Sequence, residues 1–197
     1  MAPLIRYNLA PTLNGLVASL PSHSHAWIVP DPTIDFAALF AEFSHFLMGR
    51  KTYETFLSLP EGENLLAGRP REAVVVFTRD ESKVKEWGEK VTVVREDVVG
   101  FVRGLKKKAG PEGGEEAKGK DIWIMGGGEL AGMLLRAGLV DVVEAAIMPV
   151  IVGKGVPMFG EGRGEGDTGE QGWKLQLEDV NRKESGILMT RYRVLYD

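Results

Sequence analysis

The sequence predicts an α/β fold with a mostly parallel central sheet, and two patterns predict it. First, short apolar runs alternate with amphipathic helical patterns from the first third of the chain up to Met125. Such alternation is typical of parallel strands whose connecting helices cover both faces of a sheet. Second, no helical pattern separates the last two strand-like stretches, WKLQLEDVNR and GILMTRYRVLY, so they predict an antiparallel hairpin at one edge of that sheet.

The predicted elements follow one another in order along the chain. We expect a strand over residues 4–10, a loop, and a helix in DPTIDFAALFAEF, where Asp31 would be the N-cap and Pro32 suits the first turn. A short buried strand, FLM, then ends at Gly49, and TYETFLSL opens the next helix. The elements that follow are the strand EAVVVFT, the helix DESKVKEWGE, the strand VTVV, the helix DVVGFVRGLKKKAG and the strand DIWIM.

Two glycine-rich, charged segments interrupt this pattern, at residues 109–120 and 160–172. Neither contains enough apolar residues to order itself, so we expect both to be surface loops. Because sheet strands continue on each side of them, they are not expected to be domain boundaries. The sequence therefore predicts a single domain over residues 1–197.

Composition excludes several classes of function. The net charge of −4 gives no general electrostatic reason to bind nucleic acid. The chain has no cysteine, which excludes disulfides and thiolate metal ligands, and its 3 histidines are too scattered to predict a metal site. The longest apolar stretch, near residues 142–152, is too short to span a bilayer, and the amino terminus has no apolar run of signal-peptide character. We expect a cytoplasmic protein that acts on a small molecule, without membrane or nucleic-acid partners.

Three consecutive glycines, Gly126, Gly127 and Gly128, lie between the strand DIWIM and a helical pattern, and three interpretations are open. They can form a tight turn with no ligand. They can belong to a dinucleotide fingerprint that ends at Ala131, although this one comes late in the chain and only Glu144 matches the acidic residue expected downstream. They can also form a phosphate cradle at a helix amino terminus, where backbone N–H groups and the helix dipole favour an anion.

The third interpretation predicts further anion-binding residues, and the sequence contains them. In MGRKTYE, Gly49 separates a buried strand from a helix whose first turn carries Arg50, Lys51 and Thr52. Cations are disfavoured at a helix amino terminus, so either a bound anion offsets them or both are solvated. The strand VVVFT then places Thr78 and Arg79 at its carboxyl end, and open α/β sheets bind ligands at those ends.

The segments FLMGRKTYE, VVVFTR and IWIMGGGELAGMLLRAGLVDVVEAAIMPVIVGKGVPMFG resemble the dihydrofolate reductase-like superfamily. The resemblance covers nearly the whole chain and points to the branch of the carboxy-terminal reductase domain of the riboflavin-pathway deaminase/reductase and its stand-alone relatives. It implies a three-layer fold, NADPH bound across the strand ends, and a homodimer.

The resemblance also assigns cofactor contacts. Gly49, Arg50, Lys51 and Thr52 would hold phosphates on the adenosine side, and Thr78 and Arg79 would lie near the adenine ribose and its 2′-phosphate. The helix-opening residues would hold the pyrophosphate: Gly126, Gly127, Gly128, Glu129 and Leu130. Independently, Arg50, Lys51 and Arg79 could pair with a 2′-phosphate, which predicts a preference for NADPH over NADH.

The substrate side is assigned less directly. The S-x-D-G segment of this branch is Thr12–Gly15 here, so Asn14, beside Gly15, replaces a carboxylate with an amide that cannot ionise. Asn14, Gly15 and Trp27 are expected to bind substrate, and Asp35 or Asp31 to supply the catalytic carboxylate. Asn14–Gly15 is alternatively only a turn, and either aspartate can serve the helix end instead.

These observations predict an NADPH-dependent reductase. It would transfer a hydride to a C=N or C=O bond of a small heterocycle resembling a pterin or a riboflavin precursor. The alternative is a nucleotide-binding or regulatory module of the same fold without catalytic activity, which the replacement at Asn14 favours.

Overall fold

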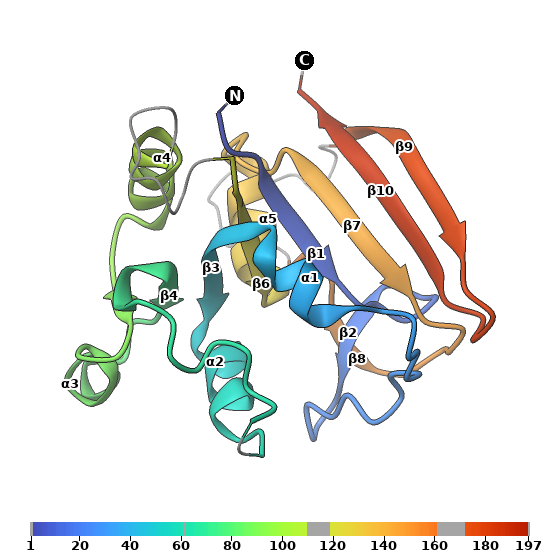
Figure 1. Ribbon diagram of the computed structural model, residues 1–197, viewed down its shortest axis with the longest axis horizontal. Coiled ribbons are helices and arrows are strands. Elements are labelled where there is room, and N and C mark those ends of the chain that lie inside the picture. The colour runs from blue at the N-terminus through green and yellow to red at the C-terminus, as the bar shows by residue number, and fades with distance from the viewer. Residues whose placement is uncertain (1, 61, 110–118, 161–171, 197) are drawn as a thin grey trace. The chain divides into compact units, whose positions relative to one another are not determined.

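The computed structural model describes residues 2–60, 62–109, 119–160 and 172–196 (Figure 1). Backbone contacts divide the chain into two compact units, and each unit combines two separate segments of the sequence. Unit 1 comprises Met1–Ile5 and Asp35–Gly126, and unit 2 comprises Arg6–Ile34 and Gly127–Asp197.

Unit 1 contains a fully parallel four-stranded sheet in the order β5-β4-β3-β6. Its strands are β3 (Phe43–Gly49), β4 (Val74–Phe77), β5 (Thr92–Val94) and β6 (Asp121–Gly126). The helices are α1 (Phe36–Ala41), α2 (Arg50–Leu57), α3 (Glu81–Trp87) and α4 (Val98–Lys108), with the 3-10 turn η1 (Arg71–Ala73) before β4. All four residues of β4 are buried, as expected for a parallel strand that is covered on both faces.

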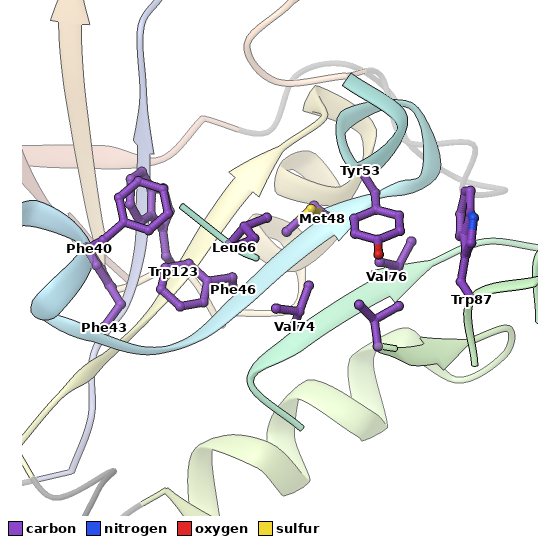
Figure 2. Close-up of a cluster of buried hydrophobic side chains, with 11 residues drawn as sticks. Phe40, Phe43, Phe46, Met48, Tyr53, Leu66, Val74, Val76, Trp87 and Trp123 are labelled. Atoms are coloured by element: carbon purple, nitrogen blue, oxygen red, sulfur yellow. The ribbon is translucent and has the colours of Figure 1, made fainter. Parts of the chain in front are cut away.

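The core on one face of this sheet is aromatic, as Figure 2 shows. At one end of the cluster, Trp123 packs against Phe43, with 4.7 Å between ring centroids, and Phe40 stacks on Phe46 at 5.3 Å. At the other end, Tyr53 of α2 meets Trp87 of α3 edge to face at 4.9 Å. The cluster therefore ties α1, α2 and α3 to the sheet.

Unit 2 contains a mixed sheet in the order β1-β7-β10-β9. Its strands are β1 (Ile5–Leu9), β7 (Val142–Ile147), β10 (Leu188–Leu195) and β9 (Lys174–Arg182). β1 and β7 are parallel, whereas β10 is antiparallel to both β7 and β9. A small antiparallel pair, β2 (Leu16–Ser19) and β8 (Gly155–Pro157), and helix α5 (Gly128–Arg136) complete the unit (Figure 1). The predicted α/β class, with mostly parallel strands and a carboxy-terminal antiparallel hairpin, is confirmed.

Three local predictions differ from the structure. The first helix begins at Phe36 rather than after Asp31, because Asp35 is its N-cap and accepts a 2.9 Å hydrogen bond from the Ala38 amide. Phe43, expected in that helix, is instead the first residue of β3. Part of the expected loop after the first strand forms β2 by pairing with the distant β8. In the described residues, no helix combines the length and hydrophobicity that a bilayer crossing requires.

Candidate functional site

Three of the predicted site segments follow neighbouring strands of unit 1 at the same edge of its sheet. In the parallel register Met48 lies beside Gly126, and Gly49 lies beside Phe77. The turns that begin at Gly49, Thr78 and Gly126 therefore leave the sheet next to one another. Parallel strands place their carboxyl ends together in this way, and ligands of open α/β sheets bind outside those ends.

The helices differ in how their amino termini are satisfied. Asp35, Asp80 and Asp97 cap α1, α3 and α4, and each side chain accepts a hydrogen bond from an amide of the first turn. The helices α2 and α5 instead begin after Gly49 and Gly127, and neither glycine can supply a side-chain cap. Among the described residues, α2 and α5 therefore have no side-chain cap of the kind that α1, α3 and α4 carry. Such amides, at the positive end of the helix dipole, suit an anionic ligand.

Each of the three consecutive glycines has a different local conformation or surroundings. Gly126 has a φ of +129°, a conformation that L side chains rarely adopt, and a Cβ there would lie 3.5 Å from Thr52 Oγ1. Gly128 is packed: a Cβ would lie 2.2 Å from the carbonyl oxygen of Pro157, and the Gly128 carbonyl accepts a 2.8 Å hydrogen bond from the Gly160 amide. Of the three, only Gly127 has open space around it, since no atom of the described residues lies within 4 Å of an added Cβ. The structural interpretation explains Gly126 and Gly128, while Gly127 is the position where the absence of a side chain leaves room for a ligand.

The cations of the α2 turn are partly compensated within unit 1. Arg50 forms a 2.8 Å ion pair with Glu54 one turn along α2, and both side chains are more than a third exposed. Hydrogen bonds from Ser82 lower the pKa of Asp80, and the positive charges of Lys83 and Arg50 lower it further. Glu54 thus offsets part of the unfavourable interaction between Arg50 and the helix dipole. Arg79, just after β4, is exposed and follows the buried Thr78.

The Thr78 side chain shapes its turn. Its Oγ1 accepts a 3.1 Å hydrogen bond from the Asp80 amide, and its own amide donates to the Val94 carbonyl. Together these contacts hold the chain between β4 and α3 in place, so that Arg79 projects from a fixed turn.

In unit 2, the side-chain amide of Asn14 forms two hydrogen bonds with the backbone of Val152, as a neighbouring strand would. Its Nδ2 donates to the Val152 carbonyl at 2.8 Å, and its Oδ1 accepts from the Val152 amide at 3.2 Å and from the Thr12 hydroxyl at 2.8 Å. Gly15 follows with a φ of +77°, as a turn requires. A carboxylate could not donate to Val152, so the amide at position 14 has a structural reason of its own.

The two candidate carboxylates are both engaged in hydrogen bonds. Asp31 accepts from the Ser185 hydroxyl and from the hydroxyl and amide of Thr33, and these bonds lower its pKa to about 2. It is therefore ionised at neutral pH and poorly suited to donate a proton. Asp35 is exposed and caps α1. Trp27, by contrast, has a buried indole N–H with no hydrogen-bond acceptor among the residues that the structure describes, which leaves a donor for a ligand.

A buried ion network in unit 2 was not predicted from the sequence. Arg6 pairs with Glu144 at 2.8 Å, with 8% and 14% of the two side chains exposed, and Asn8 and Arg191 also bind this carboxylate. Glu144 is thus fully engaged by its own sheet, which argues against the acidic role it would have in a dinucleotide fingerprint. The available signal was an arginine inside the mostly apolar first strand, because buried arginines are almost always paired.

Comparison with protein families gives one match that covers most of the chain. Residues 3–189 match the model of the RibD C-terminal domain. The chain belongs to this family. The Bacillus subtilis (strain 168) protein YyaP is 26% identical to this RibD C-terminal domain protein over 159 residues, 77% of this chain and 78% of YyaP.

Solved structures agree on the fold. A structure assigned to riboflavin biosynthesis in Shewanella sp. PV-4 superposes with a TM-score of 0.72 at 24% identity and covers 100% of both chains. The Thermotoga maritima diaminohydroxyphosphoribosylaminopyrimidine deaminase/5-amino-6-(5-phosphoribosylamino)uracil reductase gives a TM-score of 0.68 at 19% identity. The match covers 98% of this chain but only 57% of the Thermotoga protein. These findings confirm the dihydrofolate reductase-like fold and the branch that the glycine and MGRKTYE segments predicted.

Proposed function

We propose that this RibD C-terminal domain protein is an NADPH-dependent reductase that delivers a hydride to a C=N or C=O bond of a small heterocycle. One observation carries the proposal: the helices that lack a side-chain cap, α2 and α5, are those that follow glycine at the ends of β3 and β6. The family supports it, because a structural relative from Thermotoga is named as a 5-amino-6-(5-phosphoribosylamino)uracil reductase.

Within each unit, the residues suit phosphate groups of a dinucleotide. The open first turn of α2, with Gly49 and Thr52, would bind phosphate on the adenosine side, and the first turn of α5, with Glu129 and Leu130, would bind the pyrophosphate. Open space at Gly127 lets the pyrophosphate approach the backbone. NADPH, when bound, supplies the hydride, and the chain supplies orientation and a dry site.

A preference for the phosphorylated cofactor rests on Arg50, Lys51 and Arg79. Arginine binds a phosphate through two parallel hydrogen bonds, whereas NADH offers only a ribose hydroxyl at that position. Since Arg50 is held by Glu54 in the free protein, the 2′-phosphate must compete with this carboxylate. The exposed ion pair is worth little, so a dianionic phosphate would win that competition.

The proton that accompanies the hydride is assigned to Asp35 or to a water molecule. Asp31 is ionised at neutral pH, and its oxygens already accept three hydrogen bonds. The Trp27 indole N–H is available to an acceptor atom of the substrate.

The test combines binding with turnover. Calorimetric titration with NADPH and with NADH measures affinity, and loss of reduced-nicotinamide absorbance measures turnover against imines, dihydropterins, quinones and ribosylated aminopyrimidines. NADPH at about 100 times its Kd should stabilise the protein by roughly 2.7 kcal/mol. The absence of both heat and stabilisation would refute the proposal.

Binding without turnover on every substrate would instead favour the alternative, a nucleotide-binding or regulatory module. Two observations favour that alternative: the Asn14 amide is occupied by Val152, and Asp31 is occupied by Ser185 and Thr33. Neither residue is then free to act on a substrate.

We also propose that the chain forms a homodimer through β9. This strand lies at one edge of its sheet and is exposed along its whole length, although it carries Leu175, Leu177 and Val180. In β10, the partners of these residues include Thr190 and Val194, which are buried, so the face continues onto β9, where the described residues leave it exposed. Exposed apolar faces of this kind commonly mark interfaces.

A further inference from the structure

Unit 1 contains a cavity of about 370 Å³ that none of the predicted site residues lines. Its walls come from Tyr53 and Leu57 of α2, the loop over residues 64–69, and the chain at the start of β4 and just before β5. Val74 is the first residue of β4, and Val91 immediately precedes β5. The cavity therefore lies at the amino ends of these strands, away from the turns at Gly49 and Thr78 that follow the carboxyl ends.

The inner wall of the cavity is apolar and belongs to the aromatic core. Leu66, Val74 and Tyr53 lie in one layer of side chains against β3 and β4 (Figure 2). Leu57 and Val91 extend this surface. A volume near 370 Å³ is at the lower end of the range found for small-molecule sites, roughly 300–1,000 Å³, which are mostly apolar with a few placed polar groups.

The polar groups of the cavity are cationic or neutral, and none of its lining residues is acidic. The Arg69 guanidinium lies 4.4 Å from the centroid of the Phe46 ring, and its Nε donates to the Leu65 carbonyl at 3.0 Å. Among the described residues no carboxylate forms an ion pair with Arg69 or with Lys90. Partial burial lowers the pKa of Arg69, as expected for a cation that lacks a nearby anion.

The loop that carries Arg69 is held in shape without a ligand. Asn64 Oδ1 accepts a hydrogen bond from the Leu66 amide at 3.0 Å, and the Arg69 amide donates to the Leu66 carbonyl at 3.3 Å. Gly68 supplies the turn with a φ of +75°. The guanidinium carbon lies over the rings of Phe46 and Phe40, and among the described residues only the Nε of the guanidinium forms a hydrogen bond, so the terminal N–H groups are left for a planar acceptor.

We propose that this cavity binds a small organic carboxylate with a flat apolar body. Arg69 and Lys90 hold the carboxylate, and Leu57, Leu66 and Val91 contact the apolar body. A bare inorganic anion would leave the apolar wall unused, and a neutral body of the same shape would leave both cations unpaired. This site is separate from the strand carboxyl ends, and the proposal does not rest on the reductase activity.

The experiment uses benzoate as probe, with neutral benzamide and inorganic phosphate as comparisons. Amide proton–nitrogen NMR spectra of the whole chain are recorded during each titration up to millimolar concentrations. Benzoate should shift the amides of residues 64–69 and 90–91, and benzamide and phosphate should shift them far less. The Arg69→Gln change should weaken benzoate binding at least about tenfold. Lys90→Gln, a change at an exposed residue, should also weaken benzoate binding.

Lys85→Gln is the matched control, because it removes the same charge from an exposed position on α3 outside the cavity. It should leave benzoate binding unchanged. Lys90→Gln keeps the test decisive if loss of the contact with Phe46 unfolds Arg69→Gln. The proposal is overturned by equal binding of benzamide or phosphate, by shifts confined to residues 49–52, or by no shift with benzoate. NADPH affinity, measured on the same Lys90→Gln protein, should not change, so failure here is distinguishable from failure of the reductase proposal.

Discussion

Adding one methyl group at Gly128 should destabilise the protein, although alanine is normally the better helix residue. The new Cβ would lie 2.2 Å from the Pro157 carbonyl oxygen and 3.1 Å from the Gly160 amide nitrogen, both of them backbone atoms that cannot rotate away. Overpacking of this kind costs typically 1–3 kcal/mol. Displacing Gly160 would also lengthen its 2.8 Å hydrogen bond to the Gly128 carbonyl, which is worth about 1 kcal/mol. Against these losses, alanine gains up to about 1 kcal/mol of helix propensity.

We therefore expect Gly128→Ala to lower the free energy of unfolding by roughly 1–3 kcal/mol, measured by urea denaturation. Gly127→Ala is the matched control, because its Cβ meets no atom within 4 Å and its φ of −82° suits any residue. It should be neutral or stabilise by up to about 1 kcal/mol, yet weaken NADPH binding by crowding the backbone. A Gly128→Ala protein as stable as Gly127→Ala would refute the packing argument, and unchanged NADPH affinity in Gly127→Ala would refute the cradle.

Three further predictions concern charge and assembly. Arg50→Ala should weaken NADPH binding, measured by calorimetry, at least about tenfold more than NADH binding. Arg71→Ala, at the opposite strand ends, should change neither affinity. Equal losses for both cofactors would contradict the 2′-phosphate contact. Asp31→Asn should reduce stability at neutral pH. Folding lowers the pKa of this carboxyl from 3.8 to about 2, so the native aspartate adds to the free energy of unfolding above about pH 4. This contribution should vanish as the pH falls through 2, which urea denaturation at several pH values would measure. Leu177→Glu should convert a dimer to a monomer in size-exclusion chromatography, whereas Gln176→Glu, on the other face of β9, should not. A dimer that survives Leu177→Glu would exclude this face as the dimer interface.

The strand ends were predictable because their signals are local. The β-branched run that forms β4 and the glycines after β3 and β6 each record a conformation of a few consecutive residues. In a parallel sheet, such segments come together at one edge whatever the details of their packing. The pairing of Met48 with Gly126 and of Gly49 with Phe77 agrees with that rule.

Helix caps show where local signals are insufficient. Asp31 and Asp35 are both acceptable N-caps in sequence, and the choice falls on Asp35. Asp31 is drawn instead into hydrogen bonds with its neighbour Thr33 and with Ser185, a residue that follows it by 154 positions. No window of sequence around Asp31 contains Ser185.

The sequence by itself determined the order and type of the main elements and the three glycine- and hydroxyl-bearing turns at the strand ends. Tertiary structure alone decided that Asn14 pairs with the backbone of Val152, that Glu144 neutralises Arg6, and that Arg69 lies over Phe46 in a cavity wall. The physical reason is the distance along the sequence over which each interaction acts. Periodicity and turn chemistry act over a few residues, whereas the partner of a buried charge or amide is fixed by which distant segments the packed core brings within hydrogen-bonding distance.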